Sequence, residues 1–123
     1  MKVQELNHVA VYVTDVRRSA DFYQKVLKLE TMARPAFDFP GAWFRLGSHQ
    51  ELHLIGDRGE PYPEINRNNH FALRVDDIDA WQKHLGAAGV TFLKKKLRPD
   101  GAWQIFVNDP DGHTIELFVP PGL

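Results

Sequence analysis

The sequence predicts an α+β fold made of two copies of a βαβββ module. First, an offset of 62 residues brings the segment around His8 onto the segment around His70, with five identities in nine positions. Second, in both halves a stretch with apolar period two is followed by an apolar stripe at helical spacing. Third, each half then continues with three short strand-like segments. We therefore expect a single domain over residues 1–123, with one module over about 1–58 and the other over about 68–123.

The first half begins with a strand and a helix. Side chains alternate between two faces from Leu6 to Val13, which predicts a strand. Asp15 is a suitable N-cap, and apolar residues then recur at helical spacing, which predicts a helix of about 13 residues. Three further strands are expected at 30–33, 42–46 and 51–55. The polar segment 56–68, rich in Pro and Asn, is expected to be a long loop.

The second half repeats this order. A strand is predicted at 69–75, and a helix is predicted from the N-cap Asp77 to Gly89, which ends it. The later strands are expected at 90–93, 102–107 and 114–119, with a turn at 108–113. The basic run Lys94–Lys96, with Arg98, is expected in a solvated loop between the first two of these strands.

The repeat continues beyond the first strands. An offset of 60 residues aligns Gly41–Trp43 with Gly101–Trp103, which carry the same Gly-Ala-Trp sequence. An offset of 63 residues aligns the last strands of the two halves and places Glu116 opposite His53. We therefore expect Trp43 and Trp103 to be equivalent, and likewise His53 and Glu116.

Composition excludes several classes of function. With 15 Lys and Arg against 16 Asp and Glu, the formal net charge is −1, which argues against binding nucleic acid through broad electrostatics and favours a small-molecule partner. The absence of cysteine excludes disulfides, thiolate zinc sites and cysteine nucleophiles. Apolar runs are far shorter than the roughly 20 residues that span a bilayer, and the first residues lack the apolar core of a signal peptide. A soluble cytoplasmic protein without a membrane partner is expected.

Four residues at equivalent positions are candidate metal ligands. Two copies of one module often pack about a pseudo-twofold axis, so His8 would face His70 and His53 would face Glu116. Imidazole and carboxylate groups are common donors for zinc, nickel, iron, cobalt and manganese. A carboxylate on such an apolar strand is also costly to bury unless it is paired or coordinated. The alternative is that these are ordinary polar residues with hydrogen-bond partners, and Glu51, on the face of His53, competes with it as a ligand.

The other histidines are expected to have no part in the site. His49 falls in a predicted turn, His84 falls on the predicted helix, and His113 follows Asp111 and Gly112 in a hairpin turn that it would brace.

The substrate pocket is expected beside these ligands. Tyr12 and Arg74 lie four residues beyond His8 and His70 on the same strand faces, so they should border the metal. Arg74 would either pair with an anionic group of a substrate or neutralise a structural carboxylate. Aromatic residues are candidates for the pocket or for the core, and these are Phe37, Phe39, Trp43, Tyr62 and Trp103.

Several segments together resemble the vicinal oxygen chelate superfamily, which includes glyoxalase I, bleomycin-resistance proteins, fosfomycin-resistance transferases and extradiol dioxygenases. They are Asn7–Val11, Ser19–Tyr23, Asn69–Leu73 and Asp109–Leu117. The resemblance implies paired βαβββ modules that form a cup-shaped mixed sheet around a divalent metal ion, usually in a homodimer. It implies His8, His70 and Glu116 as ligands. His53 occupies the place of the fourth glyoxalase I ligand, which is usually a carboxylate or glutamine.

The resemblance also implies an activity. The expected protein is a metal-dependent enzyme of the glyoxalase kind, with lyase or isomerase chemistry on a small oxygenated substrate and Glu116 moving a proton. Two positions differ from glutathione-dependent glyoxalases, because Tyr12 replaces an arginine and Asp57 replaces an asparagine. The alternatives are an extradiol dioxygenase, a fosfomycin-type thiol transferase, and a bleomycin-resistance-like binding protein without catalysis, a branch that generally lacks these ligands.

Overall fold

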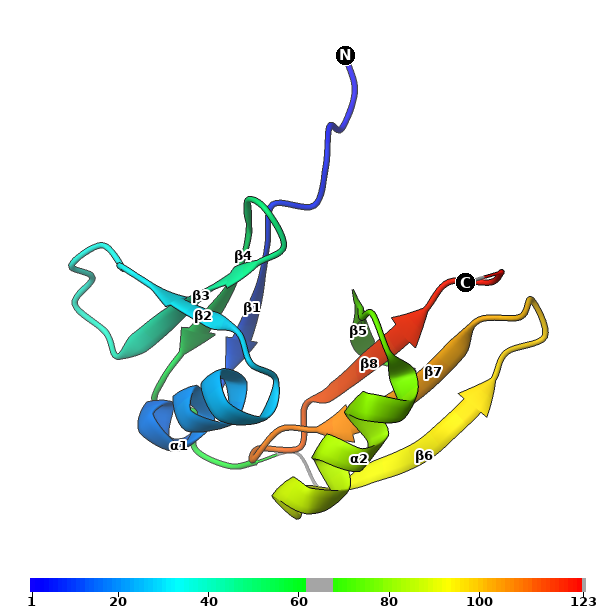
Figure 1. Cartoon of the computed structure of the whole chain (residues 1–123). Coiled ribbons are helices and arrows are strands. Elements are labelled where there is room, and N and C mark those ends of the chain that lie inside the picture. Colours follow the sequence, from blue (N-terminus) through cyan, green and yellow to red (C-terminus); the bar gives the residue numbers. More distant parts are fainter. Residues whose placement is uncertain (62–67, 123) are drawn as a thin grey trace. The chain divides into compact units, whose positions relative to one another are not determined.

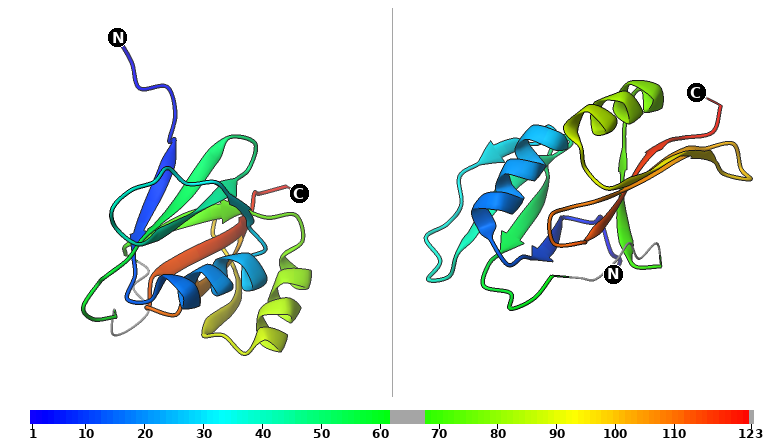
Figure 2. Two further views of the ribbon diagram at one scale, coloured as in Figure 1. Left: turned by 90° about the vertical axis from the view of Figure 1, so that its left-hand side faces the viewer. Right: turned by 90° about the horizontal axis from the view of Figure 1, so that it is seen from below.

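The computed structural model describes residues 1–61 and 68–122, and the chain divides into two compact units, Met1–Pro61 and Tyr62–Leu123. Each unit contains one βαβββ module, with a four-stranded sheet and a helix that lies on one face of it (Figures 1 and 2). The predicted α+β class with two such modules is confirmed.

The first unit has six elements in the predicted order. They are β1 (His8–Tyr12), α1 (Val16–Asp21), a π-helical turn η1 (Phe22–Val26), β2 (Glu30–Met32), β3 (Gly41–Leu46) and β4 (Gln50–Ile55). The sheet order is β1-β4-β3-β2, in which β1 runs parallel to β4 and the other neighbours are antiparallel. The hydrophobic core lies between the helical segment and β3 and β4, where Tyr23, Phe44, Leu52 and Leu54 are buried. Alternate residues of the same strands therefore lie on the other face of the sheet, which the helix leaves uncovered.

The first helix differs from its prediction in one respect. Asp15 caps it as expected, with its side chain accepting from the backbone N–H of Arg18 at 3.1 Å. The α-helical hydrogen bonding ends at Asp21, and the Leu27 N–H donates to the Phe22 carbonyl at 3.1 Å, a step of five residues. A π-helical turn thus replaces the second half of the predicted α-helix.

The second unit repeats this arrangement. Its elements are β5 (His70–Arg74), α2 (Ile78–Ala88), β6 (Phe92–Leu97), β7 (Trp103–Asn108) and β8 (Thr114–Val119). The sheet order is β5-β8-β7-β6, with β5 parallel to β8. Asp77 caps α2 by accepting from the N–H groups of Asp79 and Ala80, and Gly89 ends it in the left-handed conformation with φ of 70°. The apolar core between α2 and the sheet includes Leu85, Ile105, Ile115 and Leu117.

The lysine run lies on a strand, which corrects the expected loop. Strand β6 covers Phe92–Leu97 and pairs with β7, with a register shift between Leu93 and Lys96. This shift interrupts the alternation of side chains, and the lysines mask what remains of the strand pattern. Both effects hid the strand in the sequence.

The pairing register also corrects part of the predicted repeat. Trp43 pairs with His53 across β3 and β4, and in the second unit Phe106 pairs with Glu116 across β7 and β8. The offset is therefore 63 residues for both strands, and the counterpart of Trp43 is Phe106. The offset of 60 that aligned the two Gly-Ala-Trp sequences is wrong, because Gly101 belongs to the turn before β7, where its φ is 95°. The predicted equivalence of His53 and Glu116 agrees with the observed pairing.

Across residues 1–61 and 68–122, no helix has the length and apolar character required to cross a membrane.

Candidate functional site

His70 and Glu116 meet on the uncovered face of the second sheet. Strands β5 and β8 are neighbours, and His70 Nε2 lies 3.1 Å from Glu116 Oε1. The Glu116 side chain is only 6% exposed, although it follows Ile115 on a strand that is otherwise almost entirely apolar. The Phe106 ring packs edge-on against His70, with centroids 5.2 Å apart. The buried carboxylate thus has an imidazole partner, as its desolvation requires.

Arg98 is a second charged neighbour of Glu116. Its Nη1 lies 3.7 Å from Glu116 Oε2. The rest of the guanidinium holds Asp100, with Nε 3.0 Å from Oδ1 and Nη2 2.6 Å from Oδ2. These hydrogen bonds raise the pKa of Arg98 and lower the pKa of the Asp100 carboxyl. The sequence prediction that Arg98 is merely solvated missed this contact, and the spacing of Arg98 and Asp100 around Pro99, before a glycine turn, was the available clue.

Three rings from different strands form a stack in the first unit. His8 on β1 stacks on His53 on β4 with centroids 4.4 Å apart and an interplanar angle of 19°. His53 stacks on Trp43 of β3 with centroids 3.9 Å apart and an angle of 3°. His8 Nδ1 is 2.9 Å from the side-chain oxygen of Asn7. The stack brings together two predicted ligands and one predicted pocket residue on one face of the sheet.

Glu51 takes one nitrogen of His53. Glu51 Oε1 lies 2.8 Å from His53 Nε2, and the two side chains are 22% and 14% exposed. The residue predicted to compete with His53 for a metal ion is therefore its hydrogen-bond partner.

Phe37 and Phe39 extend the ring stack into the segment between β2 and β3. The Phe37 ring is 6.2 Å from that of Trp43 and 5.1 Å from that of Phe39. The Arg34 guanidinium lies over both phenyl rings, at 5.1 and 4.9 Å from their centroids. Both phenylalanines are largely exposed. These two aromatic pocket candidates thus gather beside Trp43.

Tyr12 and Asp57, the two positions that depart from the glutathione-dependent pattern, are in contact. The Tyr12 hydroxyl donates to the Asp57 carbonyl at 3.1 Å. Asp57 has a φ of 68°, in the left-handed region. The contact fixes the chain just after β4, on the strand that carries His53.

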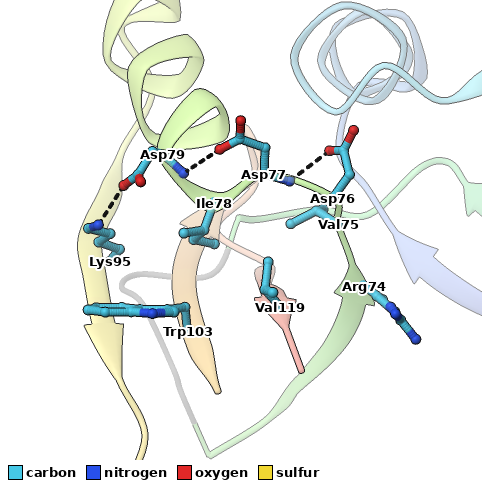
Figure 3. Close-up of a pocket in the computed structure, with 9 residues that line it drawn as sticks. All are labelled: Arg74, Val75, Asp76, Asp77, Ile78, Asp79, Lys95, Trp103 and Val119. Carbon is cyan, nitrogen blue, oxygen red and sulfur yellow. Dashed lines mark hydrogen bonds and ion pairs between the residues drawn. The ribbon is translucent and has the colours of Figure 1, made fainter. Parts of the chain in front are cut away.

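A cavity of about 850 Å³ lies within the second unit, at the start of α2 (Figure 3). Trp103 and Val119 line it from the sheet, and both lie on the face that α2 covers. The Lys95 ammonium lies 4.6 Å from the centroid of Trp103 and 2.5 Å from an Asp79 oxygen. Arg74 also borders the cavity, but its side chain points away from Trp103 (Figure 3). The structure therefore separates Trp103 from Glu116, which lies on the opposite face of the sheet.

The remaining histidines have other partners. His49 Nε2 is 2.6 Å from Glu5 and largely exposed, and the His84 ring packs edge-on against Trp81. The His113 backbone N–H donates to the Asp109 side chain at 2.8 Å, in the turn where it was expected. Tyr62, the last pocket candidate, lies outside the described residues.

The predicted ligands occur as pairs within their own units. Across residues 1–61 and 68–122, no group of three or more His, Asp or Glu side chains is arranged to hold a metal ion. His70 with Glu116, and His8 with His53, nevertheless present imidazole nitrogens and a carboxylate oxygen, which are donors that divalent transition metals accept. The donor chemistry of each pair fits such an ion.

Comparison with known proteins gives a consistent result. The model of the Glyoxalase/Bleomycin resistance protein/Dioxygenase superfamily matches residues 5–117. The chain is 32% identical to Glyoxylase I 4 of Arabidopsis thaliana over 125 residues, which cover 95% of this chain and 71% of the relative. It is 33% identical to the glutathione transferase FosA of Serratia marcescens, over 95% of this chain and 82% of the relative. A solved glyoxalase family protein from Bacillus anthracis has a TM-score of 0.82 at 26% identity, with 98% of both chains covered.

Proposed function

Because the chain belongs to the glyoxalase, bleomycin resistance protein and dioxygenase superfamily, we propose that it is a divalent-metal-dependent enzyme with lyase or isomerase chemistry. Its substrate is a small oxygenated molecule that binds next to the ion. The observation that carries the proposal is the contact of His70 with the buried carboxylate of Glu116, a pair of metal-donor groups on adjacent strands.

The proposed ligands are His8, His70 and Glu116, with His53 as a fourth. The set includes residues of both units. His53 would bind through Nδ1, because Glu51 already occupies its Nε2. Zinc, nickel, iron, cobalt and manganese all accept this donor set.

A bound divalent ion would supply an electrophilic centre that polarises a carbonyl oxygen of the substrate. Glu116 is then the residue that moves a proton between neighbouring carbon atoms of that substrate. Its apolar strand keeps water away from the carboxylate, and His70 holds the Oε1 atom in place. Tyr12 and Arg74 follow His8 and His70 on the same strands and are proposed to border the substrate, together with Trp43.

A second candidate is thiol transfer of the fosfomycin type. It is supported by the 33% identity to a glutathione transferase, which is close to the 32% identity to Glyoxylase I 4. Tyr12 and Asp57, which replace residues that hold glutathione in glyoxalases of the usual type, favour a thiol other than glutathione for either reaction. We also propose that the protein acts as a homodimer, which light scattering after size exclusion tests.

Elemental analysis of the purified and metal-reloaded protein tests the metal centre. We expect about one equivalent of a divalent metal per chain in the wild type and a loss of most of it in His8→Ala and Glu116→Ala. His49→Ala is the matched control, because His49 lies in an exposed turn and contacts Glu5. Metal content that stays low after reloading, or that these two variants leave unchanged, contradicts the proposal.

Assays of the reloaded protein separate the two reactions. Hemithioacetals formed from methylglyoxal and a panel of thiols test the isomerase, and fosfomycin with the same thiols tests the transferase. Turnover of the hemithioacetal that is lost in Glu116→Gln supports the main proposal. Turnover of fosfomycin alone reverses the order of the two candidates, and ligand binding that survives loss of His8, His70 and Glu116 favours a binding protein.

A further inference from the structure

We infer that Arg98, positioned by Asp100, binds an anionic oxygen group of the substrate. The substrate class is thereby narrowed to small oxygenated anions, such as carboxylates or phosphonates. This inference rests on the proposed function, because it places the anion next to a metal-bound substrate. It concerns a residue that the sequence pattern had assigned to solvent.

The orientation of Arg98 is fixed by its own turn. Asp100 receives the Nε and Nη2 edge of the guanidinium and also accepts from the Ala102 backbone N–H at 3.2 Å. The backbone N–H of Arg98 donates to the Ala102 carbonyl at 2.7 Å, and the Gly101 N–H donates to the Arg98 carbonyl at 2.9 Å. A planar guanidinium held along one edge points its remaining group, Nη1, in one direction.

That direction is toward Glu116. Nη1 lies 3.7 Å from Glu116 Oε2, which is longer than the roughly 2.7–2.9 Å of a close charge-assisted hydrogen bond. Arg98 is 39% exposed while Glu116 is 6% exposed, so the guanidinium is open to a small solute on the side where the carboxylate is enclosed. Arg98 is thus near the proposed ligand without being saturated by it.

The local charges favour an anionic ligand. Asp100 balances Arg98, and Glu116 contributes one negative charge beside the His70 imidazole. A divalent ion bound through Glu116 leaves this corner with a net positive charge. An anion that reaches both the ion and Nη1 would neutralise it, and arginine binds carboxylate and phosphate-like oxygens particularly well.

Cobalt-loaded protein provides a readout that does not depend on turnover. Oxalate, an anion, and hydroxyacetone, a neutral molecule, are titrated while the visible absorption of the cobalt ion is recorded. We expect Arg98→Gln to raise the Kd for oxalate by at least about tenfold while the Kd for hydroxyacetone changes less than about twofold. Arg98→Lys, which keeps the charge but not the fork, should lie in between.

Two further variants complete the test. Lys83→Gln removes one positive charge from the exposed side of α2 and should leave both affinities unchanged. Asp100→Asn loosens Arg98 without removing it, and should raise the Kd for oxalate by about threefold even if Arg98→Gln fails to fold. Equal effects of Arg98→Gln on both probes, or no effect on either, overturn the inference. A wild-type protein that binds no cobalt overturns the proposed function itself, and the inference with it.

Discussion

The indole ring of Trp43 lies flat against the imidazole of His53, with centroids 3.9 Å apart and ring planes inclined by only 3°. Because His8 covers the opposite face of the same imidazole, His53 is enclosed on both sides. Glu51 holds its Nε2 edge. The position of His8 is thus coupled to Trp43 through one ring.

Tryptophan fluorescence should report on metal binding through this stack. We expect cobalt to quench the emission of the wild type, because a paramagnetic ion at His8 lies close to Trp43. Trp43→Phe should lose most of the quenching, and Trp103→Phe should retain it, since Trp103 lies on the helix-covered face of the other sheet. Equal quenching in the two variants would contradict the placement of the ion at His8.

His53→Phe separates the two possible roles of His53. Phenylalanine keeps a flat ring between His8 and Trp43 but has no nitrogen. If His53 is the fourth ligand as proposed, the variant should bind cobalt about tenfold more weakly and still reach one equivalent at saturation. Unchanged cobalt affinity in a titration would remove His53 from the ligand set.

The pair of Arg98 and Asp100 predicts a pH dependence of stability. The pKa of Asp100 is lower in the folded protein than in the unfolded chain, so the pair stabilises the fold above about pH 4, and this stabilisation is lost as the pH falls through the folded-state pKa. Asp100→Asn should therefore lower the urea midpoint most near neutral pH. A difference from the wild type that persists undiminished near pH 2 would exclude this origin.

Two glycines should respond to alanine in opposite ways. At Gly41 a Cβ atom would lie 2.5 Å from the Leu54 carbonyl oxygen, so Gly41→Ala should destabilise the first unit by about 1–3 kcal/mol. At Gly86, within α2, a Cβ atom would meet nothing within 4 Å, so Gly86→Ala should stabilise the protein by about 0.5–1 kcal/mol. Urea denaturation measures both changes, and a common sign would contradict the packing described at one of the sites.

Leucines on β8 and β6 test the two environments of the second sheet. Leu117 is 1% exposed beneath α2, and Leu117→Ala should lower the free energy of unfolding by about 2–5 kcal/mol. Leu93 is 42% exposed on the edge strand, and Leu93→Ala should change it by less than about 0.5 kcal/mol. Similar losses in thermal or urea unfolding would show that Leu93 is covered in solution.

The strand and helix periodicities were sufficient to predict both modules, because each sheet has one covered face and therefore a regular apolar pattern. The equivalence of His53 with Glu116 followed from the same regularity. The pairing of Trp43 with Phe106 could not be found from sequence identity, since the two Gly-Ala-Trp sequences occupy different hydrogen-bonding positions. The approach of Arg98 to Glu116 was hidden as well, because it depends on a turn and a register shift rather than on periodicity.

The lysines of β6 bear on how the protein behaves at high concentration. An edge strand offers unpaired backbone groups to the edge of any neighbouring sheet, and such contacts lead to aggregation. On β6, Lys94 and Lys96 are exposed and the register shift bends the strand between Leu93 and Lys96. Stacking two copies of this edge would bring like charges together along an irregular backbone. The run therefore keeps the sheets of separate molecules apart, which gives the strand a colloidal role.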